Sequence, residues 1–272
     1  METIKPSPNS PIGIFDSGLG GLTVLKSLEK ILPNESFLYF GDTAHVPYGT
    51  KSAETVIRYS QHIMDFFQKH ETKAVVIACN TASAVAYQQL QQIYKIPLFD
   101  VVTPSVEYSI NITKSKKVGV VGTFSTIQSN AYTKMFKKLG SGCFVKEVPC
   151  PLFVPIIEEG WADTAIAKNI AETYLKELRD YNIDTLILGC THYPIMANTI
   201  QDVLSNHIEL IYSGKTVGIK LKKYLKNQNC ENSSNTSQSV KYFVTDFPQK
   251  FDELGSRFLG RPLNNVTHIP IV

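Results

Sequence analysis

Two cysteines lie in matching sequence surroundings, and thiols at such positions can act as bases or nucleophiles. Cys79 stands in VIACNT and Cys190 in ILGCTH, and each follows an apolar run. A single buried cysteine usually packs as a small hydrophobic side chain, but two in equivalent turns are hard to explain by packing alone. Cys79 also precedes a predicted helix start, where the helix dipole favours the thiolate. We therefore expect thiol chemistry at both positions.

An imidazole follows the second thiol, because His192 stands two residues after Cys190. A histidine there can stabilise a thiolate or relay a proton. The Cys-x-His spacing also occurs in zinc sites, yet four ligands would require Cys79 and a further group. Since no second closely spaced pair of ligands is present, we expect no metal.

A glycine-rich turn, DSGLGG, begins at Asp16 and precedes a predicted amphipathic helix. Such turns hold anions with their backbone N–H groups. The spacing does not match the dinucleotide fingerprint G-x-G-x-x-G, and Asp16 would repel a pyrophosphate. This carboxylate suits a substrate ammonium group or a proton relay instead. Asp42, at the end of the next strand, is interpreted as a turn acid ahead of Thr43.

Two adjacent carboxylates, Glu158 and Glu159, close the apolar run at residues 151–157. Ordinary charge at a helix end explains them, although a carboxylate beside apolar groups can have a raised pKa and shuttle protons. The motif PYGT at residues 47–50 has the composition of a turn and carries no functional signal of its own.

The elements that must position these residues are predicted from two alternating patterns. Short apolar runs indicate strands, and longer stretches with apolar residues at helical spacing indicate helices. The predicted strands are residues 12–15, 36–40, 74–78, 98–101, 118–121, 186–188, 210–212 and 242–245. Predicted helices include residues 23–31, 52–70, 163–181 and 248–259. Buried strands separated by crossover helices indicate an α/β protein with largely parallel sheets.

Two pairs of segments resemble one another, which predicts a duplicated α/β unit. Residues 12–17 resemble 118–123, and residues 76–81 resemble 187–192, at offsets of 106 and 111 residues. The fold class is therefore two similar, pseudo-duplicated α/β domains. Because ligands bind outside the carboxyl ends of strands in open α/β sheets, the active site is expected at the domain interface.

The domain boundaries follow from this duplication. We expect residues 1–101 with 212–272 to form the first domain, and residues 102–211 to form the second as an insertion. The lead-in at residues 1–11 is predicted to be disordered, and the polar stretch at 226–239 to be an exposed loop. The C-terminal tail should pack back on the first domain.

Composition narrows the class of protein. The chain has 272 residues, a net charge of +3 with acids and bases interleaved, and five scattered cysteines. This distribution favours neither nucleic acid nor a membrane as partner, and no apolar run approaches the ~20 residues that span a bilayer. The cysteine spacing does not suggest a disulfide scaffold. A cytoplasmic protein with reduced thiols is expected.

Taken in order, the motifs resemble those of bacterial glutamate racemases, over almost the whole chain after residue 11. The matching stretches are GIFDSGLGGLT (13–23), GDTAHVPYGTK (41–51), ACNTASA (78–84), VGVVGTFST (118–126), CPLFVPIIEEG (150–160) and LGCTHYPI (188–195). The combination of ACNTASA and GCTHYP is specific, because relatives acting on aspartate or hydantoins share the cysteine pair but usually not the full set.

The resemblance implies roles for individual residues. Cys79 and Cys190 match the two catalytic bases, with Cys79 acting on D-glutamate and Cys190 on L-glutamate. Asp16, Glu158 and His192 match the groups that support them, and Glu159 is not carried over. The positions that match substrate contacts are Asp16, Ser17, Tyr48, Gly49, Asn80, Thr81, Thr123, Thr191 and His192.

The resemblance also implies a cofactor-independent isomerase that supplies D-glutamate for peptidoglycan. Its partner is a small-molecule substrate, and a homodimer is an option that the sequence leaves open. Inverting an amino acid requires proton removal from one face and delivery to the other, for which two opposed thiols are apt. Without a pyridoxal-binding lysine motif, oriented hydrogen bonds must stabilise the carbanionic charge.

Three alternatives remain at this point. An aspartate racemase of the same superfamily would differ in its substrate. An amino-acid-binding module could share the duplicated architecture, but it has no use for paired cysteines. A nucleotide-dependent oxidoreductase would need the dinucleotide fingerprint that the first turn lacks.

Overall fold

Within the residues that the structure describes, ten parallel strands form two separate sheets. The computed structural model describes residues 7–232 and 238–270. The six-stranded sheet has the order β10-β9-β2-β1-β3-β4 and the four-stranded sheet the order β6-β5-β7-β8. The first sheet comprises β1 (Ile12–Asp16), β2 (Phe37–Gly41), β3 (Ala74–Ile77), β4 (Leu98–Asp100), β9 (Val240–Val244) and β10 (Val266–His268). The second comprises β5 (Lys117–Gly122), β6 (Phe144–Pro149), β7 (Thr185–Gly189) and β8 (Glu209–Tyr212).

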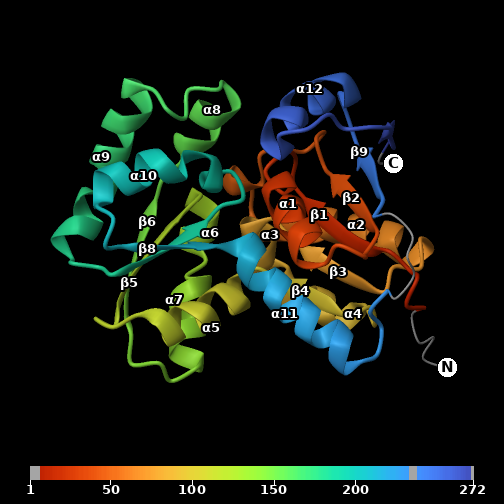
Figure 1. Cartoon of the computed structure of the whole chain (residues 1–272), viewed down its shortest axis with the longest axis horizontal. Helices are drawn as coiled ribbons and strands as arrows, with labels where there is room; N and C mark the ends of the chain where they lie inside the picture. Colours follow the sequence, from red (N-terminus) through yellow and green to blue (C-terminus); the bar gives the residue numbers. More distant parts are fainter. Residues whose placement is uncertain (1–6, 233–237, 271–272) are drawn as a thin grey trace.

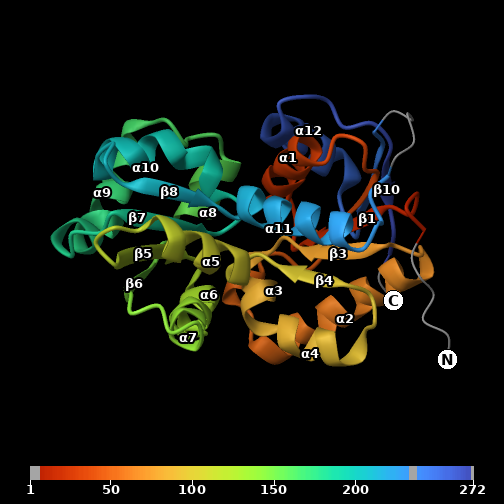
Figure 2. The ribbon, with the colours of Figure 1, turned by 60° about the horizontal axis from the view of Figure 1, so that its bottom comes forward.

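The helices divide between the two sheets, which Figure 1 shows side by side. The first lobe, built on the six-stranded sheet, holds α1 (Leu22–Ile31), the short helix η1 (Tyr48–Thr50), α2 (Ala53–Lys69), α3 (Asn80–Val85), α4 (Tyr87–Ile93) and α12 (Pro248–Leu259). The second lobe holds α6 (Phe124–Gln128), α7 (Ala131–Lys138), α8 (Phe153–Glu158), α9 (Ala165–Asp180), η2 (Tyr193–Met196) and α10 (Ala197–Leu204). The chain passes between the lobes through α5 (Val102–Ile112) and α11 (Ser213–Asn227) (Figure 2).

The two sheets repeat one strand order, which confirms the predicted α/β class with duplicated parallel sheets. The order β2-β1-β3-β4 in the first sheet corresponds to β6-β5-β7-β8 in the second. β3 and β7 are buried at every residue, as expected for parallel strands covered on both faces. Cys79 and Cys190 follow these two equivalent strands. β9 pairs with β2, so the C-terminal tail joins the first sheet. The domain boundaries at residues 102 and 211 stay a prediction.

Local signals explain where several helices begin. Ser52 caps α2 by accepting the N–H of Thr55, and Thr164 caps α9 by accepting the N–H of Ala167.

Two strands of the structure were not predicted from the sequence. β6 lies at a sheet edge and is only partly buried, so its sequence FVKEVP lacks a continuous apolar run. β10 has three residues, of which two are exposed.

The terminal segments differ from expectation where the structure describes them. Residues 1–6 and 233–237 lie outside the described residues. Residues 7–11 are not free of the fold, because the buried Lys73 donates to Pro8 O at 2.6 Å. The same ammonium group pairs with Glu35 at 2.5 Å. Within the predicted exposed loop, α11 continues to Asn227, and the buried Asn232 donates its N–H to Glu35 Oε1 at 3.0 Å. A buried lysine and glutamate need such partners, which orders both segments.

Candidate active site

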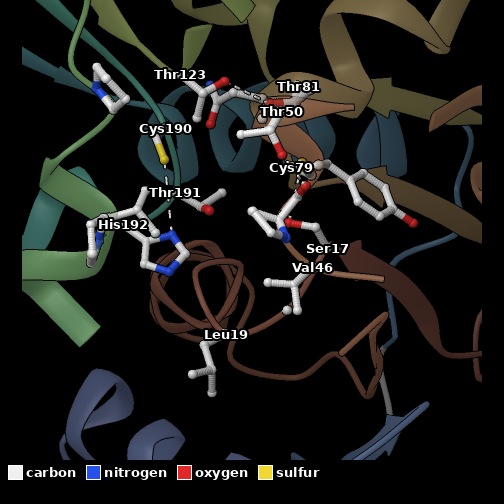
Figure 3. Close-up of a pocket in the computed structure, with 18 of the residues that line it drawn as sticks. Ser17, Leu19, Val46, Thr50, Cys79, Thr81, Thr123, Cys190, Thr191 and His192 are labelled. Carbon is white, nitrogen blue, oxygen red and sulfur yellow. Dashed lines mark hydrogen bonds between the residues drawn. The ribbon is translucent and has the colours of Figure 1, made fainter. Parts of the chain in front are cut away.

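A cavity of about 140 Å³ lies where the carboxyl ends of β1 and β3 face those of β5 and β7. Figure 3 shows side chains of both lobes around it, with Cys79 and Cys190 on two different sides. The cavity is lined by every predicted site residue except Asp16: Ser17, Tyr48, Gly49, Cys79, Asn80, Thr81, Thr123, Glu158, Cys190, Thr191 and His192. The two lobes therefore bring together residues from six separate stretches of sequence.

Cys79 lies two residues after β3 and occupies the N-cap position of α3. Its thiol donates to Ser17 Oγ at 3.8 Å. Burial, reinforced by the nearby Asp16 carboxylate, raises the pKa of Cys79 to about 12. The helix start does favour the thiolate, because the N–H of Ala82 lowers the pKa of Cys79, but burial and the like charge of Asp16 outweigh that contribution. The expected net stabilisation of a Cys79 thiolate is therefore wrong.

Asp16 lies behind the cavity wall instead of in it. Its carboxylate is completely buried and accepts the N–H of Gly18 at 3.0 Å and the hydroxyl of Thr191 at 3.3 Å. Burial raises the pKa of Asp16, and the charge of His192 opposes that shift. Because Asp16 does not line the cavity, the predicted direct contact with a substrate ammonium group is not supported by its position.

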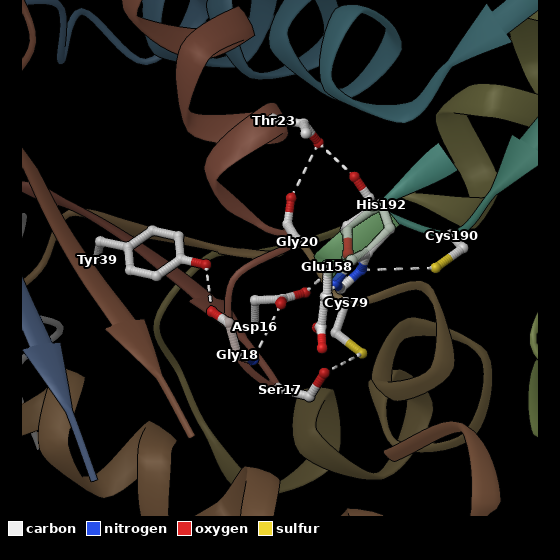
Figure 4. A network of polar contacts seen from close by, with 11 residues as sticks. Asp16, Ser17, Gly18, Gly20, Thr23, Tyr39, Cys79, Glu158, Cys190 and His192 are labelled. Atoms are coloured by element: carbon white, nitrogen blue, oxygen red, sulfur yellow. Dashed lines mark hydrogen bonds and ion pairs between the residues drawn. The ribbon is translucent and has the colours of Figure 1, made fainter. Parts of the chain in front are cut away.

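Cys190 stands at the end of a chain of polar contacts that Figure 4 displays. Its sulfur lies 3.9 Å from Nδ1 of His192, and Nε2 of the same ring lies 3.0 Å from Glu158 Oε1. Burial lowers the pKa of His192, but its contacts with Cys190 and Glu158 outweigh that effect and raise the pKa to about 10. An imidazolium therefore sits beside the Cys190 sulfur at neutral pH.

Glu158 is the last residue of α8, and its carboxylate points toward His192. Burial favours its neutral form, yet the hydrogen bond and charge of His192 prevail and lower the pKa of Glu158. The alternative of a carboxylate with a raised pKa is therefore wrong. Glu158 lines the cavity and Glu159 does not, which agrees with carrying over only the first of the pair.

Two hydrogen-bond networks hold other polar side chains of the cavity in place. Tyr48 donates to the fully buried Asp42 at 2.5 Å, and Asp42 also accepts the hydroxyl of Thr245 at 2.9 Å. Asp42, the residue after β2, thus anchors Tyr48. Across the lobes, the Thr81 hydroxyl lies 3.0 Å from that of Thr123 and 3.1 Å from that of Thr126. Asp42 and Thr126 were not predicted as site residues, although both lie inside matched motifs.

The other lining residues are mostly apolar, and sequence reasoning missed them. They are Gly18, Leu19, Val46, Pro47, Thr50, Phe124, Pro151, Val154 and Pro155. All nine lie inside the matched motifs, but apart from the Thr50 hydroxyl their side chains carry no polar group that would indicate a site. Among residues 7–232 and 238–270, no cluster of three or more His, Cys, Asp or Glu side chains is arranged to hold a metal ion.

Within the described part of the chain, no helix is long and apolar enough to cross a membrane.

Comparison with known proteins gives consistent matches. The family model for Asp/Glu/Hydantoin racemase matches residues 12–217. Glutamate racemase of Geobacter metallireducens is 44% identical over 264 residues, which cover 97% of this chain and 98% of the relative. The crystal structure of glutamate racemase from Francisella tularensis in complex with D-glutamate is 41% identical, covers 96% of this chain and 98% of its own, and has a TM-score of 0.90. The chain belongs to the Asp/Glu/Hydantoin racemase family.

Proposed function

We propose that this protein is a glutamate racemase, an isomerase that interconverts L-glutamate and D-glutamate. The observation that carries the proposal is the placement of two cysteines from equivalent strands on two sides of one cavity. Full-length relatives named glutamate racemase, at 38–44% identity, support the choice of substrate. A cavity of about 140 Å³ has room for a small molecule of several non-hydrogen atoms, which is compatible with glutamate.

The reaction is a proton exchange at the α-carbon. One cysteine thiolate removes the α-proton, and the electron pair of the C–H bond passes to Cα and the α-carboxylate. The opposite thiol then delivers its proton to the other face of Cα. The two cysteines exchange protonation states, so the step involves no oxidant or reductant. We assign proton removal from L-glutamate to Cys190 and from D-glutamate to Cys79.

Neighbouring groups support each thiol differently. His192, held by Glu158, presents positive charge to the Cys190 sulfur. Ser17 accepts a hydrogen bond from Cys79, and Asp16 behind it disfavours negative charge there. The hydroxyls of Thr81, Thr123 and Thr191 line the cavity and can donate to substrate carboxylates. These groups need no nucleotide, pyridoxal phosphate or metal, so dialysis with a chelator should leave turnover unchanged.

The finer assignments follow from this reaction. D-glutamate would serve peptidoglycan synthesis, and its supply from outside should rescue a bacterial host depleted of the protein. Two free thiols must stay reduced to work, which favours the cytoplasm. A homodimer remains an untested option that sedimentation would decide.

Serine replacement of each cysteine tests the two-thiol mechanism. Serine is similar in shape but far less acidic, so Cys79→Ser and Cys190→Ser should each lower kcat/KM by roughly 10²–10⁴-fold while the fold is retained. Polarimetry of glutamate and aspartate measures the loss and separates the two substrates. Cys143→Ser, which changes a half-buried cysteine outside the cavity, is the matched control.

Isotope labelling provides the second arm of this test. In heavy water the wild-type protein should place deuterium at Cα chiefly in the inverted product, because the delivering thiol has exchanged with solvent. A single base would label returned substrate and product comparably. Near-wild-type racemisation by either serine variant would overturn the mechanism. Heat of glutamate binding without optical change would instead indicate a binding module.

A further inference from the structure

The side-chain amide of Asn80 forms hydrogen bonds with two residues that lie far away in the sequence. Its Nδ2 donates to the hydroxyl of Tyr132 at 2.9 Å and to Ser213 Oγ at 3.2 Å. All three side chains are buried. Because Asn80 directly follows Cys79, these two hydrogen bonds hold the turn that presents the first thiol.

The two hydroxyl residues also contact the strand that carries the second thiol. Ser213 Oγ donates to the carbonyl of Leu188 at 3.4 Å, within β7. The ring of Tyr132 packs on Gly189, where a Cβ would lie 3.3 Å from the Tyr132 hydroxyl. Gly189 immediately precedes Cys190. Through the Tyr132 and Ser213 side chains, the Asn80 amide therefore connects the turn that holds Cys79 to the strand that precedes Cys190.

The origin of these residues makes the network sensitive to the arrangement of the lobes. Asn80 begins α3 of the first lobe, and Tyr132 lies in α7 of the second. Ser213 is the first residue of α11, through which the chain returns to the first lobe. A change in the angle between the lobes must stretch these bonds. The Asn80 Oδ1 atom has no hydrogen-bond partner in the described part of the chain and belongs to a residue that lines the cavity.

We propose that Tyr132 and Ser213 are positioning residues, which act through Asn80 to fix the Cys79 turn relative to the Cys190 turn. This inference rests on the proposed function. Neither side chain lines the cavity, so neither touches the substrate. Their hydroxyls set the alignment of the two thiols, and a small misalignment of reacting groups is costly in rate.

Substitutions that remove only the hydroxyls test the proposal. Tyr132→Phe and Ser213→Ala should each lower kcat/KM about tenfold in both directions, because misplacement of about 1 Å can cost up to 10²-fold. Tyr94→Phe is the matched control, since it removes a tyrosine hydroxyl bonded to Gln61 O and Asp65 far from the cavity. The control should lose comparable thermal stability without any change in kcat/KM.

Double variants that include Asn80→Ala distinguish a positioning role from a general structural role. In an Asn80→Ala background, adding Tyr132→Phe or Ser213→Ala should change kcat/KM by less than twofold, because the group they act through is gone. Independent effects that multiply in the double variants would overturn the proposal. So would wild-type kinetics in both single variants.

Alkylation supplies a readout that needs no turnover. The ratio of iodoacetamide modification at Cys190 to that at Cys79, measured by mass spectrometry, should shift at least threefold in Tyr132→Phe and stay constant in Tyr94→Phe. An unchanged ratio would contradict the positioning role even if Asn80→Ala were inactive. A wild-type protein that fails to racemise glutamate would refute the proposed function, while the alkylation ratio would still decide this inference.

Discussion

At the scale of single residues, the two cavity thiols have unequal electrostatic surroundings. Cys79 is buried above the Asp16 carboxylate, and its pKa is raised to about 12. Cys190 faces His192, whose pKa is raised to about 10 by contacts that outweigh its burial. The resting protein thus holds a protonated Cys79 opposite a sulfur that is paired with an imidazolium.

Selective alkylation checks this asymmetry. At pH 8, iodoacetamide should modify Cys190 at least about tenfold faster than Cys79, because burial and the Asp16 charge keep Cys79 in the unreactive thiol form. His192→Gln should slow modification of Cys190 and leave Cys79 unaffected. The half-buried Cys143 and Cys230 serve as internal references in the same digest. Faster modification of Cys79 would contradict the assigned resting state.

The His192 pairing also predicts how stability depends on pH. The folded pKa of about 10 exceeds the ordinary value of 6.5, so protonation stabilises the folded state. That contribution is fully present below pH 6.5 and is lost as the pH rises through 10. Urea unfolding should show the largest stability difference between wild type and His192→Gln near pH 6, and a shrinking difference toward pH 10. A difference that grew with pH would contradict the pairing.

At the scale of elements, the turn after β1 packs against the second lobe. A Cβ on Gly20 would lie well inside van der Waals contact with Thr191 Oγ1 and His192 Nδ1. From the next helix, Thr23 donates to the carbonyl of Thr191 at 2.7 Å. The close approach of the Thr191 and His192 side chains therefore requires glycine at position 20, and the Thr23 hydrogen bond holds the turn that follows Cys190.

Gly20→Ala tests this contact. The added methyl group should displace Thr191 and His192, lower stability by about 1–3 kcal/mol and reduce kcat/KM by up to about 10²-fold. Gly18→Ala is the stability control, because a Cβ there finds its nearest neighbour at 3.9 Å. Thermal unfolding and polarimetry measure the two effects. Equal melting temperatures for the two variants would show that the lobes yield easily at this point.

At the scale of the whole molecule, the site is divided between two lobes, and residues of both line the cavity. Contacts such as Thr81 with Thr123 and Thr23 with Thr191 cross the interface. Cys79 and Cys190 are only 5% and 6% exposed. We predict that the lobes separate to admit substrate, with α5 and α11 as the two connections between them. Closure then excludes water and strengthens polar interactions with the substrate.

Small-angle scattering can detect this motion. The ligand-free protein should have the larger radius of gyration, and saturating D-glutamate should compact it, because ligand contacts from both lobes favour the closed arrangement. The Cys79→Ser variant allows the measurement without turnover. Identical profiles with and without ligand would indicate a site that is already closed.

Much of this arrangement was readable from local sequence pattern. Buried parallel strands appear as continuous apolar runs, so eight of the strands were located, and the two that were missed lie at sheet edges. The repeated cysteine turns predicted two equivalent strands, since equivalent strand ends in duplicated sheets present equivalent residues. These features depend on neighbours within a few positions, which a sequence displays directly.

The protonation of the site was decided only by tertiary structure. Sequence placed Cys79 at a helix start and suggested a thiolate, whereas burial and the Asp16 charge favour the thiol. The lowered pKa of Glu158 depends on His192, which is 34 residues away in the chain. Tyr132 and Ser213 meet Asn80 from separations of 52 and 133 residues. Desolvation and charge pairing are set by whatever packs nearby in space, and local sequence carries no record of those neighbours.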